Sequence, residues 1–484
     1  MQTDDLLFAS IPELARLIRA RRTSPVELTE MFLKRLDTKG RELRAVAHLM
    51  RESALREART AERELKAGRD RGTLHGIPYG VKDLLATRDA PTTWGARPYK
   101  DQRFTEDATV INRLRAAGAI LVAKLAMVEL AGGMGYNQAD ASLTGACLTP
   151  YNTKFWSGGS SSGPGAAVGS GCVPFAIGSE TSGSIITPAA FCGVTGLRPT
   201  YGVISRHGAM ALSWTLDKLG PMCRTAEDCG IVLRAIAGRD PLDPTSVDFN
   251  FGAPPMRTNR AGNRRPAAQA TLVRYRVAVM KDSYEKAQPE VRANFLRSLD
   301  LLRKAAAGRF QLEIKMDVPL PDFPYGAAVG TIVDAEGASA FRDLIESGKV
   351  SELASPEGRT GGYAASLVTA VDYLHAMRLR QPMRRAWKEL FTKYDVIAAP
   401  SRSTVAYPVE RTFDKAYPGI NAASPIGASN LVGVPAISIP NGFGADNLPT
   451  GIQFVAPAFG ENTLIKLAQI YQSADELHRR RPRE

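Results

Sequence analysis

The feature of this sequence that most constrains its fold is a series of short apolar runs, separated by glycine, that starts near residue 76. The runs are GIPYGVKDLL, AAGAILVAKL, CVPFAIGS and FCGVTGLRP, and helical stretches such as DATVINRLRAAG lie between them. Such runs predict buried strands, and their alternation with helices predicts a mixed or largely parallel sheet. Near the C-terminus, YDVIAAPS, NLVGVPAISIP and LPTGIQFVAP are expected to complete this sheet. We therefore predict an α/β fold with a central mixed, twisted sheet that helices cover on both faces.

The remaining segments can be arranged around this sheet as one domain. Residues 1–70 are typical of helices that pack on a core, and residues 71–240 hold the core itself. Residues 241–270 are rich in proline, arginine and asparagine, which predicts a surface excursion. Residues 271–484 are predicted to form the remainder of the same α/β domain, with a helical insert at about 318–390.

The chain is strongly basic, with a formal net charge of +13 at pH 7. This charge would suit a nucleic-acid partner if it formed one patch. The basic residues are instead spread along the chain, with local runs at 257–265 and 479–483. Runs of this kind are usually solvated surface, so we do not expect nucleic acid as a partner.

The cysteines and the N-terminal stretch indicate a reducing compartment. The cysteine count is odd and no CxxC pair occurs, which argues against a disulfide framework. The stretch MQTDDLLFASIPELARLIR has early acidic residues and no apolar run before a small-residue cleavage site. Nowhere do 18 uncharged apolar residues follow one another. We therefore expect a cytoplasmic protein that does not span a membrane.

Residues 156–171, WSGGSSSGPGAAVGSG, form a polar, glycine-dense segment that predicts a loop leading into a helix. A phosphate-binding loop would need GxxxxGK[ST], and no lysine occupies the required place; a dinucleotide-binding turn would need a strand directly before it. Gly159, Ser161 and Gly163 do fit GxSxG, the nucleophile elbow of α/β-hydrolases, in which Ser161 would act with a histidine. The preceding NTKFWSG is not strand-like, which weakens this alternative.

A second polar segment, GSETSGSIITPAAFCG, follows the apolar run CVPFAIG. A strand that ends in a turn rich in glycine and hydroxyl residues exposes serine side chains beside free backbone N–H groups. Ser182 and Ser184 are therefore candidates for a catalytic nucleophile. The alternative is that both serines only cap the next helix.

Lys82 lies within the apolar run GIPYGVKDLL, where burial of a charged ammonium group is costly. Its side chain could extend to the surface or pair with Asp83. It could also serve as a neutral base, because burial lowers the pKa of lysine. The residues by themselves leave both interpretations open.

Four successive motifs resemble those of the amidase signature family. They are GIPYGVKDLL, GGSSSGPGAAVGSG, GSETSGSIITPAAFCGVTGLRPTYG and NLVGVPAISIPNG. The resemblance extends from about residue 24 to residue 471 and implies the amidase signature fold, with residues 71–240 as the signature core. It also implies amide hydrolysis without a metal, a cofactor or a catalytic histidine.

The resemblance assigns roles to individual residues. Lys82 corresponds to the family's catalytic lysine, Ser160 to a bridging serine in a cis peptide, and Ser184 to the nucleophile. Ser160 and Ser184 are 24 positions apart, a spacing familiar in this family. The oxyanion hole would consist of the backbone N–H groups of Thr181, Ser182, Gly183 and Ser184.

The chain departs from the family pattern beside the nucleophile. Ser182 stands where many members have glycine, and Ile186 stands where many have arginine. Glu180 occupies a place where aspartate is common, and we interpret it as an acceptor for the loop. Arg198 and Asp217 match further family positions, which we interpret as structural. These departures concern substrate preference more than the catalytic residues.

The resemblance implies a hydrolase that cleaves the C–N bond of non-peptide carboxylic amides through a serine acyl-enzyme. Aryl amides, esters and carbamates are further candidate substrates for the same chemistry. The substrate would be a small molecule, and we expect Met134, Gly135 and Trp214 to contact it. The oligomeric state stays open, with a homodimer as one option.

A second interpretation is the glutaminase-type subunit of a tRNA-dependent amidotransferase complex, which has a similar motif layout. The positive net charge mildly suits this function. The segment NAASPIGAS before Asn430, however, has no acidic residue to hold the ammonium group of glutamine. A third interpretation, an inactive binding protein, predicts the loss of a catalytic residue, and Lys82, Ser160 and Ser184 are all present.

Overall fold

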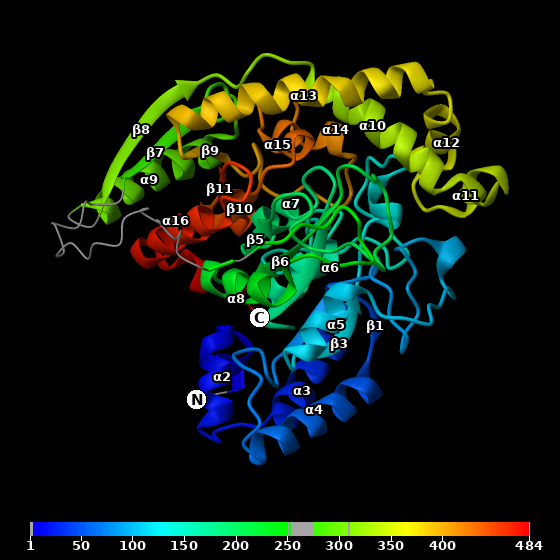
Figure 1. Cartoon of the computed structure of the whole chain (residues 1–484), viewed down its shortest axis with the longest axis vertical. Coiled ribbons are helices and arrows are strands. Elements are labelled where there is room, and N and C mark those ends of the chain that lie inside the picture. The colour runs from blue at the N-terminus through cyan, green and yellow to red at the C-terminus, as the bar shows by residue number, and fades with distance from the viewer. Residues whose placement is uncertain (1–2, 250, 253–273, 308–309, 484) are drawn as a thin grey trace, which may run out of the picture.

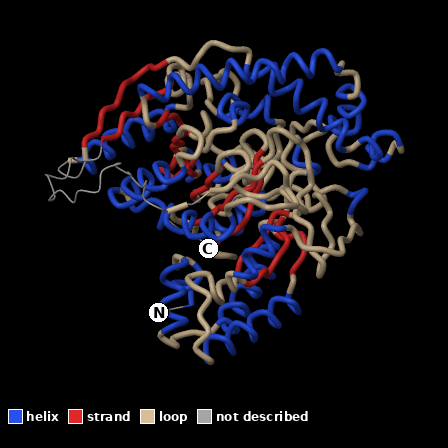
Figure 2. Tube along the Cα trace, in the orientation of Figure 1, coloured by secondary structure: helices blue, strands red, loops and turns tan. Residues whose placement is uncertain are grey.

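A computed structural model of the protein describes residues 3–249, 251–252, 274–307 and 310–483. Most of the surface excursion predicted at 241–270 therefore lies outside the described residues. The middle of the molecule is rich in loops, whereas long helices lie toward its two ends (Figure 2).

The fold is built on one large sheet. Its strands are β1 (Val46–Leu49), β2 (Pro78–Lys82), β3 (Ile120–Leu125), β4 (Phe175–Glu180), β5 (Thr195–Arg198), β6 (Lys218–Cys223), β7 (Arg274–Met280), β8 (Gln311–Val318), β9 (Val396–Pro400), β10 (Ala436–Phe443) and β11 (Pro449–Val455). In the described chain they follow the order β1-β3-β2-β4-β6-β5-β10-β11-β9-β7-β8. The strand β2 pairs in parallel with β3 and β4, and β7 with β8 and β9, whereas β4 and β6 are antiparallel. The predicted mixed sheet is confirmed.

The helices surround this sheet (Figure 1). They are α1 (Thr3–Leu7), α2 (Ile11–Arg19), α3 (Pro25–Arg35), α4 (Arg51–Lys66), α5 (Thr109–Ala116), α6 (Ser162–Gly169), α7 (Ile186–Phe191), α8 (Ala226–Ile236), α9 (Pro289–Ala306), α10 (Tyr325–Ala340), α11 (Arg342–Glu346), α12 (Pro356–Ala365), α13 (Ala370–Lys393), α14 (Phe413–Ala416), α15 (Ile426–Val432) and α16 (Glu461–Ala474). The helices α2, α3 and α4 lie at one end of the molecule, and α10 and α13 lie at the other.

Two apolar cores show that helices cover both faces of the sheet. Ile437 and Ile439 of β10 belong to a core with residues of α9 and α16. Ala436, on the opposite face of the same strand, belongs to a core with residues of α13 and α15. This alternation follows from the two-residue period of a strand. It confirms the predicted covering of the sheet by helices on both sides.

The sequence patterns did not predict β1, β6 and β8. The strand β1 has only four residues, all partly exposed. The strand β6 reads KLGPMC, and its glycine and proline are ordinarily signals of a turn. The strand β8 forms the edge of the sheet beside β7, and its side chains alternate in exposure until the buried Val318. The helices α10 to α13 follow β8 in the region where the helical insert was predicted.

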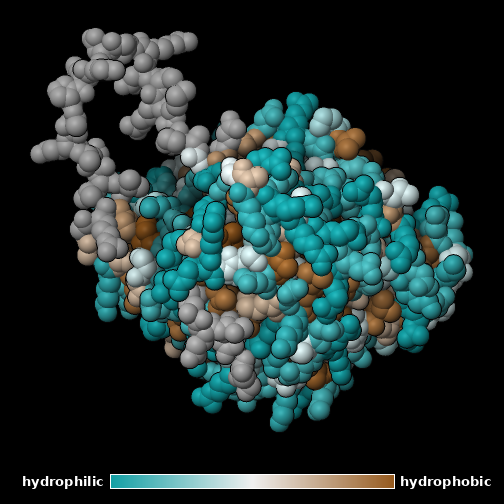
Figure 3. All heavy atoms as spheres, turned by 90° about the horizontal axis from the view of Figure 1, so that it is seen from below, coloured by the Kyte–Doolittle hydropathy of each residue, from teal (hydrophilic) through white to brown (hydrophobic). Residues whose placement is uncertain are grey.

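The molecular surface is mostly hydrophilic on the face drawn in Figure 3, with apolar side chains grouped toward its middle. Over the ranges that the structure describes, no helix has both the length and the apolar character needed to cross a membrane.

Candidate active site

The turn between β4 and α7 carries Ser184. Glu180, the last residue of β4, holds this turn, because one carboxylate oxygen accepts hydrogen bonds from the N–H groups of Ile185 at 2.8 Å and Ile186 at 3.0 Å. These N–H groups open α7 and would otherwise have no partner within the helix. Ser184 directly precedes them and is 9% exposed. The nucleophile candidate thus lies at a fixed strand-to-helix turn.

The second carboxylate oxygen of Glu180 anchors the turn to the sheet. It accepts hydrogen bonds from Arg198 at 2.8 Å and from the Asn430 amide at 2.7 Å. Burial alone would raise the pKa of Glu180, but the charge of Arg198 and these hydrogen bonds lower it to about 2. Glu180 is therefore a permanently charged acceptor beneath the turn.

The backbone of this turn offers free hydrogen-bond donors. Gly183 has a φ of +93°, a conformation that glycine adopts at little cost. Ser182 is exposed. No described residue accepts a hydrogen bond from the backbone N–H groups of Thr181, Ser182, Gly183 or Ser184. Such a set of donors can bind an oxyanion.

Lys82, Ser160 and Ser184 form one chain of hydrogen bonds. Lys82 Nζ donates to Ser160 Oγ at 2.7 Å, and Ser160 Oγ donates to Ser184 Oγ at 2.9 Å. Lys82 is the last residue of β2, and Ser160 belongs to the loop before α6, where the Gly159–Ser160 peptide bond is cis. All three side chains are buried. The fold thus brings together the three residues that the family resemblance singled out.

The hydroxyl partners distinguish Ser160 from the two serines that follow it. Ser161 Oγ donates to the carbonyl of Ser179 at 3.0 Å, and Ser162 Oγ donates to the carbonyl of Ala126 at 3.3 Å. In the described part of the chain, no histidine is hydrogen-bonded to any of these serines. The serine–histidine arrangement of an α/β-hydrolase elbow is therefore not formed at Ser161.

Burial makes Lys82 suited to act as a base. Its side chain is 0% exposed. This burial lowers the pKa of Lys82 to about 7, although the negative charges of Asp217 and Glu180 oppose the effect. A large share of Lys82 is therefore a neutral amine near neutral pH, with a lone pair that can accept a proton.

Ser179 is a second hydroxyl partner of Lys82 that the sequence motifs did not indicate. Lys82 Nζ donates to Ser179 Oγ at 2.9 Å. Ser179 lies in β4 and Thr181 directly follows this strand, and both residues line the same cavity. The sequence held one signal for this role of Ser179: a hydroxyl residue near the end of a predicted buried strand, just before the catalytic turn.

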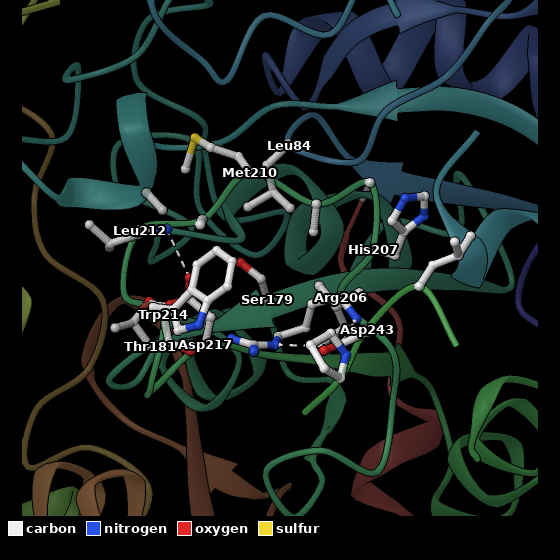
Figure 4. A pocket seen from close by; sticks show the side chains of 17 residues that line it. Leu84, Ser179, Thr181, Arg206, His207, Met210, Leu212, Trp214, Asp217 and Asp243 are labelled. Carbon is white, nitrogen blue, oxygen red and sulfur yellow. Dashed lines mark hydrogen bonds and ion pairs between the residues drawn. The ribbon is translucent and has the colours of Figure 1, made fainter. Parts of the chain in front are cut away.

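A cavity of about 240 Å³ lies beside the hydroxyl groups of Ser179 and Thr181 (Figure 4). Ser179, the hydrogen-bond partner of Lys82, and Thr181 of the catalytic turn line it, whereas Lys82, Ser160 and Ser184 are not among its described lining residues. Trp214, one of the predicted substrate contacts, also lines it and is 62% exposed. The other two predicted substrate contacts, Met134 and Gly135, are not among the described residues that line this cavity. The walls are mostly apolar and include Leu84, Met210, Leu212, Leu219, Leu242 and Pro244.

The charged side chains around the cavity already have partners. Arg206 donates to the carbonyl of Trp214 and to the hydroxyl of Thr245, both at 2.7 Å. Asp243 accepts hydrogen bonds from the backbone N–H groups of Arg206 at 2.8 Å and Thr245 at 3.0 Å. Asp217 accepts hydrogen bonds from Thr181, Leu212 and Ser213. The cavity therefore offers an apolar surface rather than free charges.

In the described part of the chain, the cysteines and the residue types that bind metals form no additional site. The five cysteines, Cys147, Cys172, Cys192, Cys223 and Cys229, are buried and free of disulfides. Over the described ranges, no group of three or more histidine, cysteine, aspartate or glutamate side chains is arranged to hold a metal ion.

Most of the chain matches the sequence model of a known protein family. This family is described as Amidase, and the match covers residues 27–465. The chain belongs to this family. The amidase signature resemblance is therefore confirmed, and the protein is an amidase-family hydrolase.

Relatives within the amidase family have more than one function. A glutamyl-tRNA(Gln) amidotransferase subunit from Chloroflexus aurantiacus is 35% identical over 485 residues, which cover 95% of each chain. A peptide amidase solved with the competitive inhibitor chymostatin is 28% identical, with a TM-score of 0.82 over 98% of this chain and 99% of that one. A chain from a vestigial protein complex, described as revealing the origins of an s-triazine catabolic enzyme, has a TM-score of 0.83 at 26% identity, over 96% of this chain and 99% of that one.

Proposed function

We propose that the protein is a serine amidase of small carboxylic amides, with Ser184 as nucleophile, Ser160 as proton relay and Lys82 as base. The hydrogen-bond chain from Lys82 to Ser184, which ends beside free backbone donors, is the observation that carries this proposal. An unassisted serine hydroxyl is a poor nucleophile and needs an adjacent base. Esters and carbamates can enter the same chemistry.

The first step is attack of Ser184 Oγ on the substrate carbonyl carbon. The hydroxyl groups rotate, so that Ser184 gives its proton to Ser160 Oγ while Ser160 gives its own to neutral Lys82 Nζ. The negative charges of Asp217 and Glu180 favour the ammonium group that results. The developing oxyanion accepts hydrogen bonds from the turn at 181–184, and one such donor is typically worth about 2.7 to 4 kcal/mol.

The second step breaks the C–N bond and leaves an acyl group on Ser184. The leaving nitrogen takes a proton from Ser160, which Lys82 replenishes, and departs as a neutral amine. A water molecule then gives a proton to the same relay and attacks the acyl carbon. The bond between the acyl carbon and Ser184 Oγ then breaks, Lys82 returns its proton to Ser184 Oγ through Ser160, and the carboxylic acid is released.

We assign the cavity that Thr181 and Trp214 line as the place of a substrate substituent, and it favours one that is uncharged and apolar. Its walls are mostly apolar, and Arg206, Asp217 and Asp243 are engaged with protein partners. A free amino acid such as glutamine carries two charged groups that need free partners when they leave water. Neutral aryl or alkyl amides carry no charged group, so their binding does not require a charge to leave water without a partner.

The curated relatives favour a second candidate function. At 35% identity over most of the chain, they carry the name of an amidotransferase subunit. In this second candidate, the same serine chemistry releases ammonia from glutamine within a complex. The segment at 421–429 contains no carboxylate for the glutamine ammonium group, which counts against it.

The two candidates predict different substrates for the chain alone. We expect the purified protein to release 4-nitroaniline from neutral anilides and to release little ammonia from glutamine. The two products are measured side by side, with Ser184→Ala as the blank for each. Ammonia release from glutamine without anilide turnover would contradict the small-amide amidase function and support the amidotransferase function.

The pH dependence of anilide hydrolysis tests Lys82 as the base. Protonated Lys82 cannot take a proton from Ser160, and burial places its pKa at about 7. We therefore expect kcat/KM to rise about tenfold per pH unit below this value and to level off above it. The rates are measured with a substrate that does not titrate. A rising limb near the ordinary pKa of lysine would contradict a neutral Lys82.

A further inference from the structure

Asp217 lies between the cavity wall and the turn that carries Ser184. Its Oδ1 accepts a hydrogen bond from the Thr181 hydroxyl at 2.5 Å. Its Oδ2 accepts hydrogen bonds from the N–H groups of Leu212 at 2.8 Å and Ser213 at 2.9 Å. One carboxylate thus joins the loop that bears Trp214 to the first residue of the catalytic turn (Figure 4).

The far side of this loop is held by the helical region. Glu336 of α10 accepts hydrogen bonds from the Ser213 hydroxyl at 2.5 Å and the Thr215 N–H at 3.0 Å. Arg380 of α13 donates to the Thr215 carbonyl at 3.1 Å. The loop therefore has partners on both sides, which fixes Asp217 relative to Thr181.

The charges near Asp217 come from several elements. Lys218 follows it in β6, and its buried Nζ has no hydrogen-bond partner among the described residues. Glu180 lies opposite Lys218 on β4, and Arg206 lies on the cavity wall. Burial raises the pKa of Asp217 itself, whereas its hydrogen bonds from Thr181, Ser213 and Leu212 favour the charged form. In that form, Asp217 stabilises the ammonium group of Lys82 and opposes the lowering of the Lys82 pKa by burial. Removal of that charge therefore favours the neutral amine.

We propose that Asp217 is a positioning residue that orients the oxyanion turn through Thr181. This inference rests on the proposed serine amidase function. It extends the structural role expected of Asp217, because the residue would then set a rate and a pH dependence as well as a loop conformation.

The first test is the pH profile of Asp217→Asn. The pH at which its kcat/KM rises is expected to move to lower pH, since an opposite charge that favours protonated Lys82 is lost. Asp243→Asn is the matched control, because it removes the other cavity-wall carboxylate and should leave the apparent pKa in place. If the role of Asp217 were purely structural, Asp217→Asn would lower the amount of active enzyme but would leave the rise of kcat/KM at the same pH.

The second test compares two substitutions of Thr181. Thr181→Val removes the hydroxyl that binds Asp217 and should lower kcat about tenfold or more with little change in KM, because the oxyanion donors lose alignment. Thr181→Ser keeps the hydroxyl and should retain most of kcat. Melting temperatures confirm that each variant is folded.

The outcomes separate this inference from the proposed function. An active wild type whose pH limb is the same in Asp217→Asn would overturn the inference alone. A wild type without amide turnover would overturn both. If Asp217→Asn does not fold, the comparison of Thr181→Val with Thr181→Ser tests the positioning role. Equal kcat values for Thr181→Val and the wild type would reject that role.

Discussion

Replacement of Ser184 by alanine is expected to lower kcat for anilides by about 10⁴- to 10⁶-fold, the scale seen when a serine nucleophile is removed. Ser184 Oγ is the terminal atom of the hydrogen-bond chain, and no other described serine accepts a hydrogen bond from Ser160 Oγ. The variant keeps the backbone N–H groups of the turn, so substrate binding should persist. Steady-state anilide hydrolysis measures the loss.

The acyl-enzyme gives an independent readout of the same prediction. Intact mass spectrometry of the wild type treated with an activated ester or carbamate should show one added acyl group on Ser184, and Ser184→Ala should show none. Ser182→Ala is the matched control, because it removes the exposed neighbouring hydroxyl while its N–H stays in the turn. An alanine variant of Ser184 that kept more than a few per cent of turnover would contradict the nucleophile assignment.

The catalytic residues were predictable from the sequence to different degrees. Ser184 follows a recognisable strand in a turn with glycine, and Lys82 is a conspicuous cation in an apolar run. Ser160 depended on the family resemblance, because three consecutive serines have the same chemistry. Only their three-dimensional partners separate them, since one faces Lys82 and the other two face carbonyl groups.

The cavity wall shows why other parts of the site escaped prediction. The loop that carries Arg206, Trp214 and Asp217 has no regular period, so its sequence does not indicate which side chains face a substrate. Its conformation depends on distant residues such as Glu336 and Arg380. These hydrogen bonds join segments more than a hundred residues apart in the sequence, so local sequence patterns do not predict them. Strand β6 escaped for a related reason, because its neighbours in the sheet override the turn signals of its glycine and proline.

Replacement of Lys82 by methionine is expected to lower kcat/KM about 10³-fold or more, the upper range for loss of a general base. The same change should raise the melting temperature. Burial lowers the pKa of Lys82 to about 7, below its value in the unfolded chain. The wild type therefore carries a stability cost that is full below pH 7 and fades as the pH rises toward the ordinary pKa of lysine. The gain in melting temperature should be larger at pH 6 than at pH 9.

Lys124 provides a control that separates the catalytic effect from the general effect of removing a buried lysine. It is also 0% exposed, but its Nζ lies 3.0 Å from Asp83 and 2.6 Å from the Thr92 hydroxyl. Lys124→Met leaves the Asp83 charge without this partner and should lower the melting temperature, while the folded fraction keeps its turnover. Opposite shifts in melting temperature for the two variants, with loss of turnover only in Lys82→Met, would indicate a lysine retained for chemistry at a cost in stability. A Lys82→Met variant with near wild-type kcat/KM would require a different base for Ser184.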